Sequence, residues 1–441
     1  MDQKYFERFF QYLKRGTSPF HVVIESVEML EQAGFQPLEL KQAWSVEPGG
    51  KYYMVHHGSA LIAFTVGKKV YYRQPLRIAA SHGDFPGLRI KTHPEMTEEG
   101  YQKLNVEMYG GAIRNTWLDR PLSVSGRVAL RSKDVLKPEI RYVDYQRPVL
   151  TIPNLAVHIN REINKGIELD LQTDMLPIFG IDLKENEEQH KNQDCEKKKS
   201  EFFMESLAQL LQVEKEDILD FELSIYNMDE PMFVGYGKEF ISAPRLDNLT
   251  SSYAILQSVI SQERLKGINM AVIFDHEEVG SSTKQGAGSV LLPMVLEKIY
   301  DSLGISRTVF LESLSEALLL SVDVAHGFHP NYGGKYDVTN KPVLGKGVCI
   351  KEACSQSYAT DCEAIAIVQQ MCEKGGAAYQ KSVNRSGGGG GSTLGAIAGA
   401  LIPTNIIDLG VPLLAMHSAR ELMGSADQLA VQKLMDVFFS I

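Results

Sequence analysis

The sequence predicts an α/β fold in which a smaller, β-rich module interrupts a larger domain. The second half of the chain alternates short apolar strands with helical patterns, a rhythm typical of βαβ units. The segment from about Thr92 to Tyr236 is instead rich in β-branched and aromatic residues, with turn signals such as Tyr109-Gly110-Gly111. We therefore expect residues 1–92 and 236–441 to form one discontinuous α/β domain, and residues 93–235 to form an inserted β-rich module.

Local patterning predicts the individual elements. The opening stretch, MDQKYFERFFQYLKRG, is typical of an amphipathic helix. Met270 to Phe274 is interpreted as a buried strand, Leu291 to Ser302 as a helix, and Ala317 to Val324 as a further strand. The charged run from Asp182 to Ser200 has almost no apolar residue to bury, so we expect a solvated loop or an exposed helix there.

Composition narrows the function classes. A chain of 441 residues exceeds the size at which one hydrophobic core keeps growing, which favours two domains. The formal net charge of -10 argues against a dedicated nucleic-acid binder. The opening helix lacks the pattern of a secretory signal, and the apolar stretch Gly395 to Met416 is broken by prolines and an aspartate, so no membrane span is expected. Five cysteines without a C-x-x-C pair indicate reduced thiols and a cytoplasmic location.

The stretch Ala271 to Gly280, AVIFDHEEVG, is the most informative for chemistry. An apolar strand ends there in four ionisable groups, and open α/β sheets place ligands at the carboxyl ends of strands. Glu277 and Glu278 would repel one another if both were buried, and a nearby cation removes that conflict. One glutamate can coordinate a metal while the other acts as general base towards water. The residue four after His276 is Gly280, so the H-E-x-x-H zinc motif is excluded.

Further ligands must come from other predicted strand ends. Each candidate taken singly is more often structural, for instance an aspartate that caps a helix. Together, two histidines, two aspartates and a glutamate give each of two metal ions three protein ligands, with one aspartate shared. Two Zn²⁺ ions are also neutralised by three carboxylates and one hydroxide. The candidates are His82 in RIAASHGDFPGLR, with Asp84 placed to orient it, Asp247 in ISAPRLDNL, Asp323 in SVDVAHGFHPNY, and His417 in LGVPLLAMHSARE.

Several long strings resemble the aspartyl aminopeptidase family of cocatalytic zinc metallopeptidases. They include SHGDFPGLRIK, YGGAIRNTWLDRPLSVSGRV, IPNLAVHINREINKG and FDHEEVGSSTKQGA, and the resemblance runs from about Ile78 to Glu421. It implies a zinc-peptidase-like mixed sheet sandwiched by helices, interrupted by a β-rich dimerisation domain. It also implies assembly from dimers into a large homo-oligomer, commonly a dodecamer, and peptides as substrates.

The resemblance assigns a role to each matching residue. His82 and Asp323 resemble ligands of one zinc, Glu278 and His417 ligands of the other, and Asp247 the bridging ligand. Glu277 matches the general base and Asp84 the carboxylate that orients the first histidine. His158 matches a histidine that reaches a neighbouring subunit's active site, and His326, Lys351 and Tyr358 match substrate-contacting residues.

Two departures from the family pattern affect the predicted pocket. The basic K-Q-R-Y stretch is here Ser355 to Tyr358, which lacks the arginine. A later segment with an aspartate and a proline is replaced by Arg385-Ser386 and glycines 387–391, which we interpret as a flexible loop. A pocket selecting acidic residues needs positive charge, so these changes weaken the expected acidic preference.

Other interpretations keep the metals but change the activity. The same centre could serve a deacylase or carboxypeptidase, and a metal-stabilised assembly protein without catalysis is a third alternative. Such ligands also accept Co²⁺ or Mn²⁺ in place of Zn²⁺.

Overall fold

The computed structural model describes residues 3–69, 75–166, 168–182, 201–387, 391 and 393–441. It confirms the α/β class, with helices on a mixed sheet. The chain divides into two compact units, the first made of Met1–Phe85, Pro231–Met416 and Glu421–Ile441, the second of Pro86–Glu230 and His417–Arg420. The sequence placed the division near Thr92 and Tyr236.

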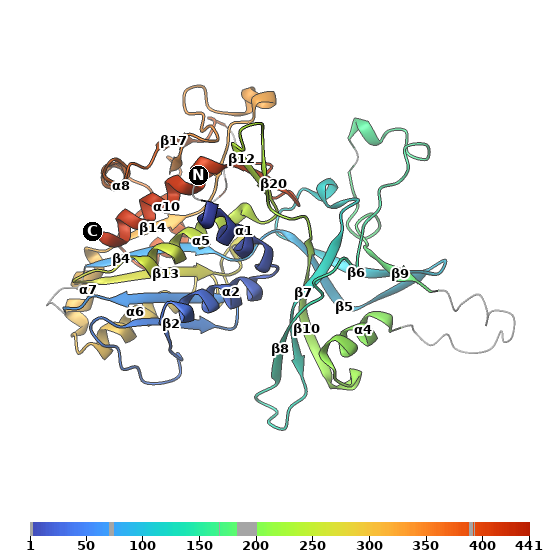
Figure 1. Cartoon of the computed structure of the whole chain (residues 1–441), viewed down its shortest axis with the longest axis horizontal. Coiled ribbons are helices and arrows are strands. Elements are labelled where there is room, and N and C mark those ends of the chain that lie inside the picture. The colour runs from blue at the N-terminus through green and yellow to red at the C-terminus, as the bar shows by residue number, and fades with distance from the viewer. Residues whose placement is uncertain (1–2, 70–74, 167, 183–200, 388–390, 392) are drawn as a thin grey trace. The chain divides into compact units, whose positions relative to one another are not determined.

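A nine-stranded mixed sheet forms the centre of the first unit (Figure 1). Its middle strands β13, β4, β14 and β18 run parallel to one another, whereas β2, β3 and β16 introduce antiparallel pairs. In sheet order the strands are β1 (Gln36–Pro37), β2 (Lys51–His56), β3 (Ala60–Val66), β13 (Ile268–Phe274), β4 (Leu76–His82), β14 (Leu318–Val322), β18 (Asn405–Gly410), β16 (Val348–Glu352) and β17 (Tyr379–Val383).

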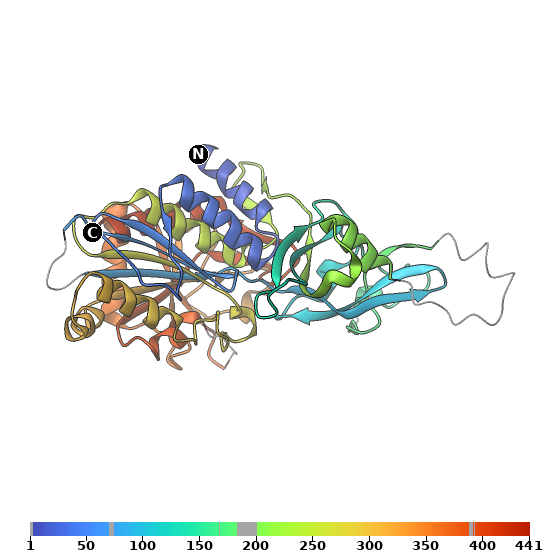
Figure 2. The ribbon, with the colours of Figure 1, turned by 90° about the horizontal axis from the view of Figure 1, so that it is seen from below.

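Helices cover both faces of this sheet (Figure 2). One core contains α1 (Gln3–Arg15), α2 (Pro19–Gln32), α5 (Leu246–Ser261), α8 (Cys362–Gly375) and α10 (Ser425–Ser440). The other contains α6 (Leu291–Ser302), α7 (Arg307–Ser315) and α9 (Leu394–Gly399). Strand β4 shows why the central strands are apolar throughout, because Ala79 packs into the first core while Ile78 and Ala80 pack into the second.

A second sheet of five strands in the same unit contains His326 and Glu421. Its order is β11 (Met232–Val234), β12 (Phe240–Ala243), β20 (Glu421–Gly424), β19 (Pro412–Leu414) and β15 (Ala325–His326).

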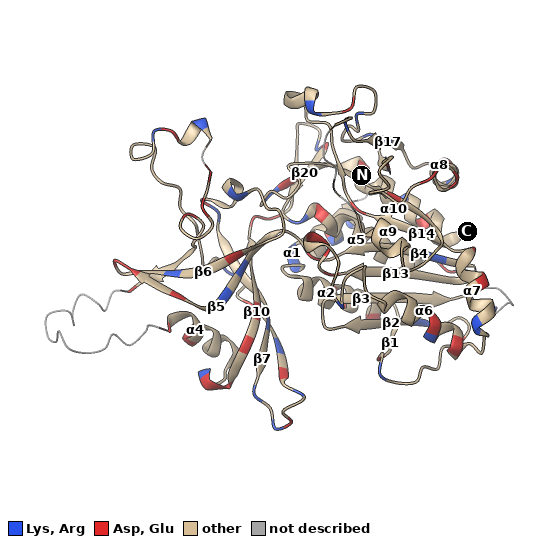
Figure 3. Cartoon of the chain, turned by 180° about the vertical axis from the view of Figure 1, so that it is seen from behind, with Lys and Arg blue, Asp and Glu red and all other residues tan. Residues whose placement is uncertain are grey.

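The second unit is a six-stranded antiparallel sheet packed against the helix α4 (Phe202–Leu211). Its core gathers alternate strand residues such as Val124 and Leu223 with Phe203 of the helix, as expected for a sheet with one buried face. Acidic and basic residues are interspersed along both units (Figure 3). In order, the strands are β8 (Glu139–Asp144), β7 (Leu122–Leu130), β10 (Ile218–Asn227), β5 (Gly87–Glu98), β6 (Tyr101–Tyr109) and β9 (Ile178–Ile181).

The predicted elements of the first unit are present. Helix α6 has the predicted bounds, β13 contains the predicted strand 270–274, and β14 is shorter than the predicted 317–324. The charged run after Asp182, up to Ser200, and glycines 388–390 lie outside the described residues. Among the helices that the structure describes, none has the length and apolar character needed to span a bilayer.

Candidate metal centre

Three parallel strands end side by side at one edge of the nine-stranded sheet. In the register of β13 and β4, Phe274 pairs with His82, and in that of β14 and β4, Ser321 pairs with Ala80. His82 is therefore the last residue of β4, while Glu277 follows β13 and Asp323 follows β14. This is the edge where parallel sheets place their ligands.

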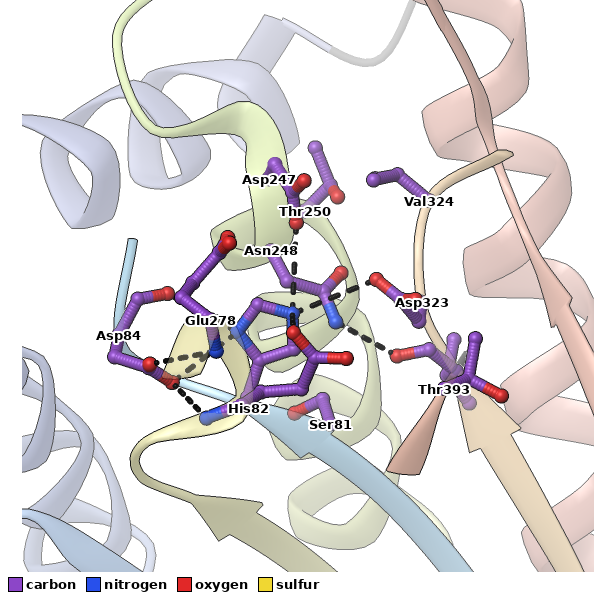
Figure 4. A network of polar contacts seen from close by, with 12 residues as sticks. Ser81, His82, Asp84, Asp247, Asn248, Thr250, Glu278, Asp323, Val324 and Thr393 are labelled. Atoms are coloured by element: carbon purple, nitrogen blue, oxygen red, sulfur yellow. Dashed lines mark hydrogen bonds and ion pairs between the residues drawn. The ribbon is translucent and has the colours of Figure 1, made fainter. Parts of the chain in front are cut away.

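The two ring nitrogens of the buried His82 face different groups. Nδ1 lies 3.0 Å from the backbone carbonyl oxygen of Asp84 and 3.4 Å from its carboxylate. Nε2 lies 3.5 Å from an oxygen of Asp247 and 3.5 Å from an oxygen of Asp323. Figure 4 shows the imidazole between Asp84 and Asp323. Because the Asp84 carbonyl can only accept, Nδ1 carries a proton and Nε2 points at the two carboxylates.

Two overlapping groups of side chains have the composition of a metal site. In each group one candidate ligand atom per residue lies within 4.8 Å of the others. The first group is His82, Glu277 and Glu278, and the second is His82, Asp247 and Asp323. The structure thus brings together four of the five predicted ligands and the predicted general base within the first unit.

Asp84 also accepts two backbone hydrogen bonds, a role that the sequence did not indicate. Its Oδ1 accepts the backbone N–H of Glu277 and its Oδ2 accepts that of Glu278, both at 3.1 Å. The two glutamates form the start of a short 3-10 turn, Glu277–Val279, directly after β13. A single buried carboxylate thereby fixes the backbone of the predicted base and of the neighbouring ligand, in addition to facing His82.

Asp247 is held from the opposite side. Its backbone N–H donates to the carboxylate of the buried Glu421 at 3.0 Å, and the side chain of Asn248 donates to the carbonyl oxygen of Val322 at 2.9 Å. The N-cap position of α5 is occupied by Arg245, and Asp247 has non-helical backbone angles. The regular turns of α5 therefore begin after Asp247 and Asn248, which leaves the Asp247 carboxylate at the start of the helix and beside His82.

Electrostatics at the cluster reflect buried negative charge. Burial raises the pKa of Glu277 to about 7, with His82 opposing the shift, and burial together with Asp247 raises the pKa of Glu278. Burial also acts to raise the pKa of Asp323, but Lys351 and His82 outweigh it and lower that pKa. Burial acts to lower the pKa of His82, yet Asp323 and Asp84 raise it well above its usual value.

These residues fit a divalent cation. Nε2 of His82 and two carboxylate oxygens converge at 3.5 Å, and the pKa of His82 rises because the surrounding carboxylates attract positive charge. Imidazole and carboxylate are the donors that zinc takes together in proteins. A cation placed among them would relieve the repulsion between the carboxylates.

Comparison with known proteins identifies the family. A family model described as aminopeptidase I zinc metalloprotease (M18) matches residues 12–439. The chain belongs to the M18 family. Its relatives include the probable M18 family aminopeptidase 2 of Clostridium novyi strain NT, 41% identical over 439 residues, covering 99% of this chain and 99% of the relative. That of Pseudomonas aeruginosa is 36% identical over 432 residues, with 97% and 96% covered.

Solved M18 structures share the fold. The chain superposes on a subunit from the cryo-EM structure of the Ape4 and Nbr1 complex with a TM-score of 0.92 at 33% identity, covering 98% of this chain and 84% of that chain. The S. cerevisiae mApe1 dodecamer gives a TM-score of 0.82 at 27% identity, with 98% and 95% covered. This M18 chain is accordingly a metal-dependent aminopeptidase, a hydrolase of peptide bonds, and zinc is the metal of its family.

The residues predicted to contact substrate have different environments. In this M18 chain Lys351 is buried in β16, with its Nζ 5.2 Å from the ring centre of the buried Tyr358. His326 is exposed at the end of β15. His158 is exposed in the second unit. His417 also clusters with the second unit, and its Nδ1 lies 3.2 Å from the carbonyl oxygen of Gly111. The approach of His158 and His417 to the centre stays a prediction.

Sequence reasoning missed the residues that support the ligands. Glu421 was overlooked, although a glutamate at the start of an apolar strand was a usable signal. His276 was considered only for a motif that it does not complete, yet its ring lies 2.8 Å from the hydroxyl of Thr283 and 3.4 Å from the carboxylate of Asp275. These contacts hold the turn that carries Glu277.

Proposed function

We propose that this chain hydrolyses the first peptide bond of peptides with a free N-terminus, using two zinc ions per subunit. In this proposal His82 and Asp323 would hold one ion, Glu278 and His417 would hold the other, and Asp247 would be shared by both. The observation that carries it is the convergence of Nε2 of His82 with oxygens of Asp247 and Asp323 at 3.5 Å each. Cobalt or manganese can replace zinc at such ligands.

Glu277 moves the proton in this mechanism. Bound zinc supplies Lewis acidity, which polarises the scissile carbonyl and brings the pKa of water to about 7. Glu277 accepts the proton of the attacking water and then gives it to the leaving amine. Burial raises the pKa of Glu277 to about 7 in the metal-free protein, and cations held beside it would lower that pKa, which leaves the carboxylate ionised to accept a proton. Asp84 keeps its backbone in place.

Substrate contacts and assembly complete the proposal. We assign substrate contacts to His326, Lys351 and Tyr358, and a role in a neighbouring subunit's site to His158, on family resemblance. The second unit would be the dimerisation domain of a homo-oligomer, for which the dodecamer of the similar mApe1 gives support. A cytoplasmic location stays a prediction. Because Ser355 and Ser357 stand where the family's K-Q-R-Y stretch has its two basic residues, we propose a weak acidic preference.

The test uses the full-length chain, zinc and chromogenic aminoacyl substrates with acidic, basic and neutral side chains. Glu277→Gln should lose roughly 10²–10⁴-fold in kcat while retaining about two zinc ions per chain. Glu297→Gln, an exposed site on α6, is the matched control and should keep full activity. Retained activity in Glu277→Gln, or faster cleavage of N-acylated than of free peptides, would contradict the proposal.

A further inference from the structure

Lys351 is a buried cation beside the candidate metal centre. Only 2% of the residue is exposed; it lies on β16, and its Nζ is 5.2 Å from the ring centre of Tyr358. Its Nζ donates to Oδ2 of Asp323 at 3.1 Å and to the carbonyl oxygen of Val324 at 3.0 Å. Two of its three N–H donors are thus directed at Asp323 and at the residue that follows it.

The two carboxylate oxygens of Asp323 face different partners. Oδ2 meets Lys351, whereas Oδ1 lies 3.5 Å from Nε2 of His82. The backbone of Asp323 is also fixed, because its N–H donates to the carbonyl oxygen of Leu409 at 2.8 Å. A Cβ on Gly410 would lie 1.8 Å from the Asp323 carbonyl oxygen, so β18 approaches this backbone as closely as only glycine permits. With the backbone held, the rotation of the carboxylate is set by its contacts with Lys351 at Oδ2 and with His82 at Oδ1.

We propose that Lys351 is a positioning residue for Asp323. The lysine holds Oδ2 of that carboxylate away from the metal centre, so that Oδ1 stays on the side of His82. The proposal rests on the two-metal centre proposed above. This role is separate from a substrate contact, because the ammonium group of Lys351 already binds the proposed metal ligand Asp323 when no substrate is bound. A carboxylate that can present only one oxygen limits the coordination number of its metal, which leaves room for water and substrate.

The experiment compares the Lys351→Met chain with wild type after loading with Co²⁺, whose visible absorption reports its coordination. Methionine keeps the length of the apolar stem but donates no hydrogen bond, so Asp323 becomes free to rotate. We expect bound cobalt to remain near the wild-type amount while its absorption spectrum changes. We expect kcat to fall roughly 10–100-fold for acidic and neutral substrates alike, as when an outer partner of a metal ligand is removed.

The metal-free proteins give a second readout. Removing Lys351 leaves the Asp323 carboxylate buried without its ion pair, so metal-free Lys351→Met should melt at a lower temperature than metal-free wild type. Lys381→Met is the matched control: Lys381 lies on β17 opposite Ile350 and pairs with Glu352. This variant loses the same charge on the adjacent strand and should leave the spectrum unchanged.

The alternatives give different results. An unchanged cobalt spectrum with activity lost only towards acidic substrates would overturn the proposal, because Lys351 would then act on substrate alone. If Lys351→Met does not fold, Lys351→Leu, which also donates no hydrogen bond, is measured instead. A spectrum for Lys351→Leu identical to that of wild type, together with the wild-type kcat, would also overturn the proposal. Wild-type protein that binds no second cobalt would contradict the two-metal function itself.

Discussion

Nδ1 of His82 lies 3.0 Å from the backbone carbonyl oxygen of Asp84, and the Asp84 carboxylate lies 3.4 Å from the same nitrogen. Both residues are buried, so this contact is shielded from water. It sets the tautomer of the histidine, and the same carboxylate holds the backbone of Glu277 and Glu278. One aspartate therefore links the ends of β4 and β13.

Replacement of Asp84 tests this link. In Asp84→Asn, an NH₂ group replaces one of the two carboxylate oxygens. This group donates and cannot accept, so the hydrogen bond from the backbone N–H of Glu277 or Glu278 is lost. We expect zinc affinity or kcat to fall roughly 10–100-fold, with the fold retained. Zinc content, kcat and circular dichroism measure the three quantities. Asp301→Asn, exposed on α6, provides the control, and wild-type kinetics in Asp84→Asn would contradict the assigned role.

Metal removal should lower stability. Without a bound cation, His82 and Lys351 only partly offset the repulsion among the four carboxylates of Asp247, Glu277, Glu278 and Asp323. We expect chelation to lower the melting temperature, since a ligand at about 1,000 times its Kd stabilises the folded state by about 4 kcal/mol. Added Zn²⁺ should restore the transition and added Mg²⁺ should not, because Mg²⁺ prefers all-oxygen octahedral sites. An identical melting curve for zinc-stripped and zinc-loaded protein would count against the site.

The buried carboxyl group of Asp427 should make the free energy of unfolding depend on pH. Asp427 on α10 accepts the backbone N–H groups of Gly345 and Gly347, each at 2.7 Å, yet burial raises its pKa to about 7. The folded state then holds a proton that the unfolded state, with a pKa near 3.9, releases earlier. Its contribution is present below about pH 4 and is lost as the pH rises towards 7.

Asp427→Asn isolates that contribution, because asparagine does not titrate. We expect the free energy of unfolding of wild type, relative to the variant, to fall between pH 4 and 7 by about 1.4 kcal/mol per unit of pKa difference. Urea titrations at a series of pH values measure it. A difference between the two proteins that is flat across this range, or that rises with pH, would refute the shift.

Two glycines on either side of Thr393 should respond differently to substitution. A Cβ on Gly395 would lie 2.6 Å from Oδ1 of Asp408 and 2.8 Å from Cβ of Ser321, whereas a Cβ on Gly391 would meet no atom within 4 Å. The Asp408 carboxylate accepts from the backbone of Ala359 and the hydroxyl of Thr393, so it cannot move without loss. We expect Gly395→Ala to destabilise the protein by about 1–3 kcal/mol or more, and Gly391→Ala to be neutral. Equal unfolding midpoints for the two variants would contradict this.

Local periodicity explains which helices and strands could be predicted from the sequence. The helix Leu291–Ser302 was found with its bounds because its apolar residues repeat at helical spacing and pack on one face of the sheet. The strand that ends at His82 and the strand that precedes Glu277 were found because an apolar run followed by ionisable groups is a local signal. The division between the units was placed several residues late on each side: Thr92 lies inside β5, the first strand of the second unit, and Tyr236 lies after β11, which already belongs to the first unit.

The sequence by itself determined the α/β class, the family and the candidate ligands, because each depends on residue types at short spacing or on long matching strings. Tertiary structure alone decided which carboxylate supports which ligand. Glu421 on β20 pairs with Asp247 at the start of α5, and Lys351 on β16 pairs with Asp323 after β14, so each pairing joins elements that are distant in the sequence. Such contacts follow from strand order and register, which arise only when several separate segments pack together, so no local pattern encodes them.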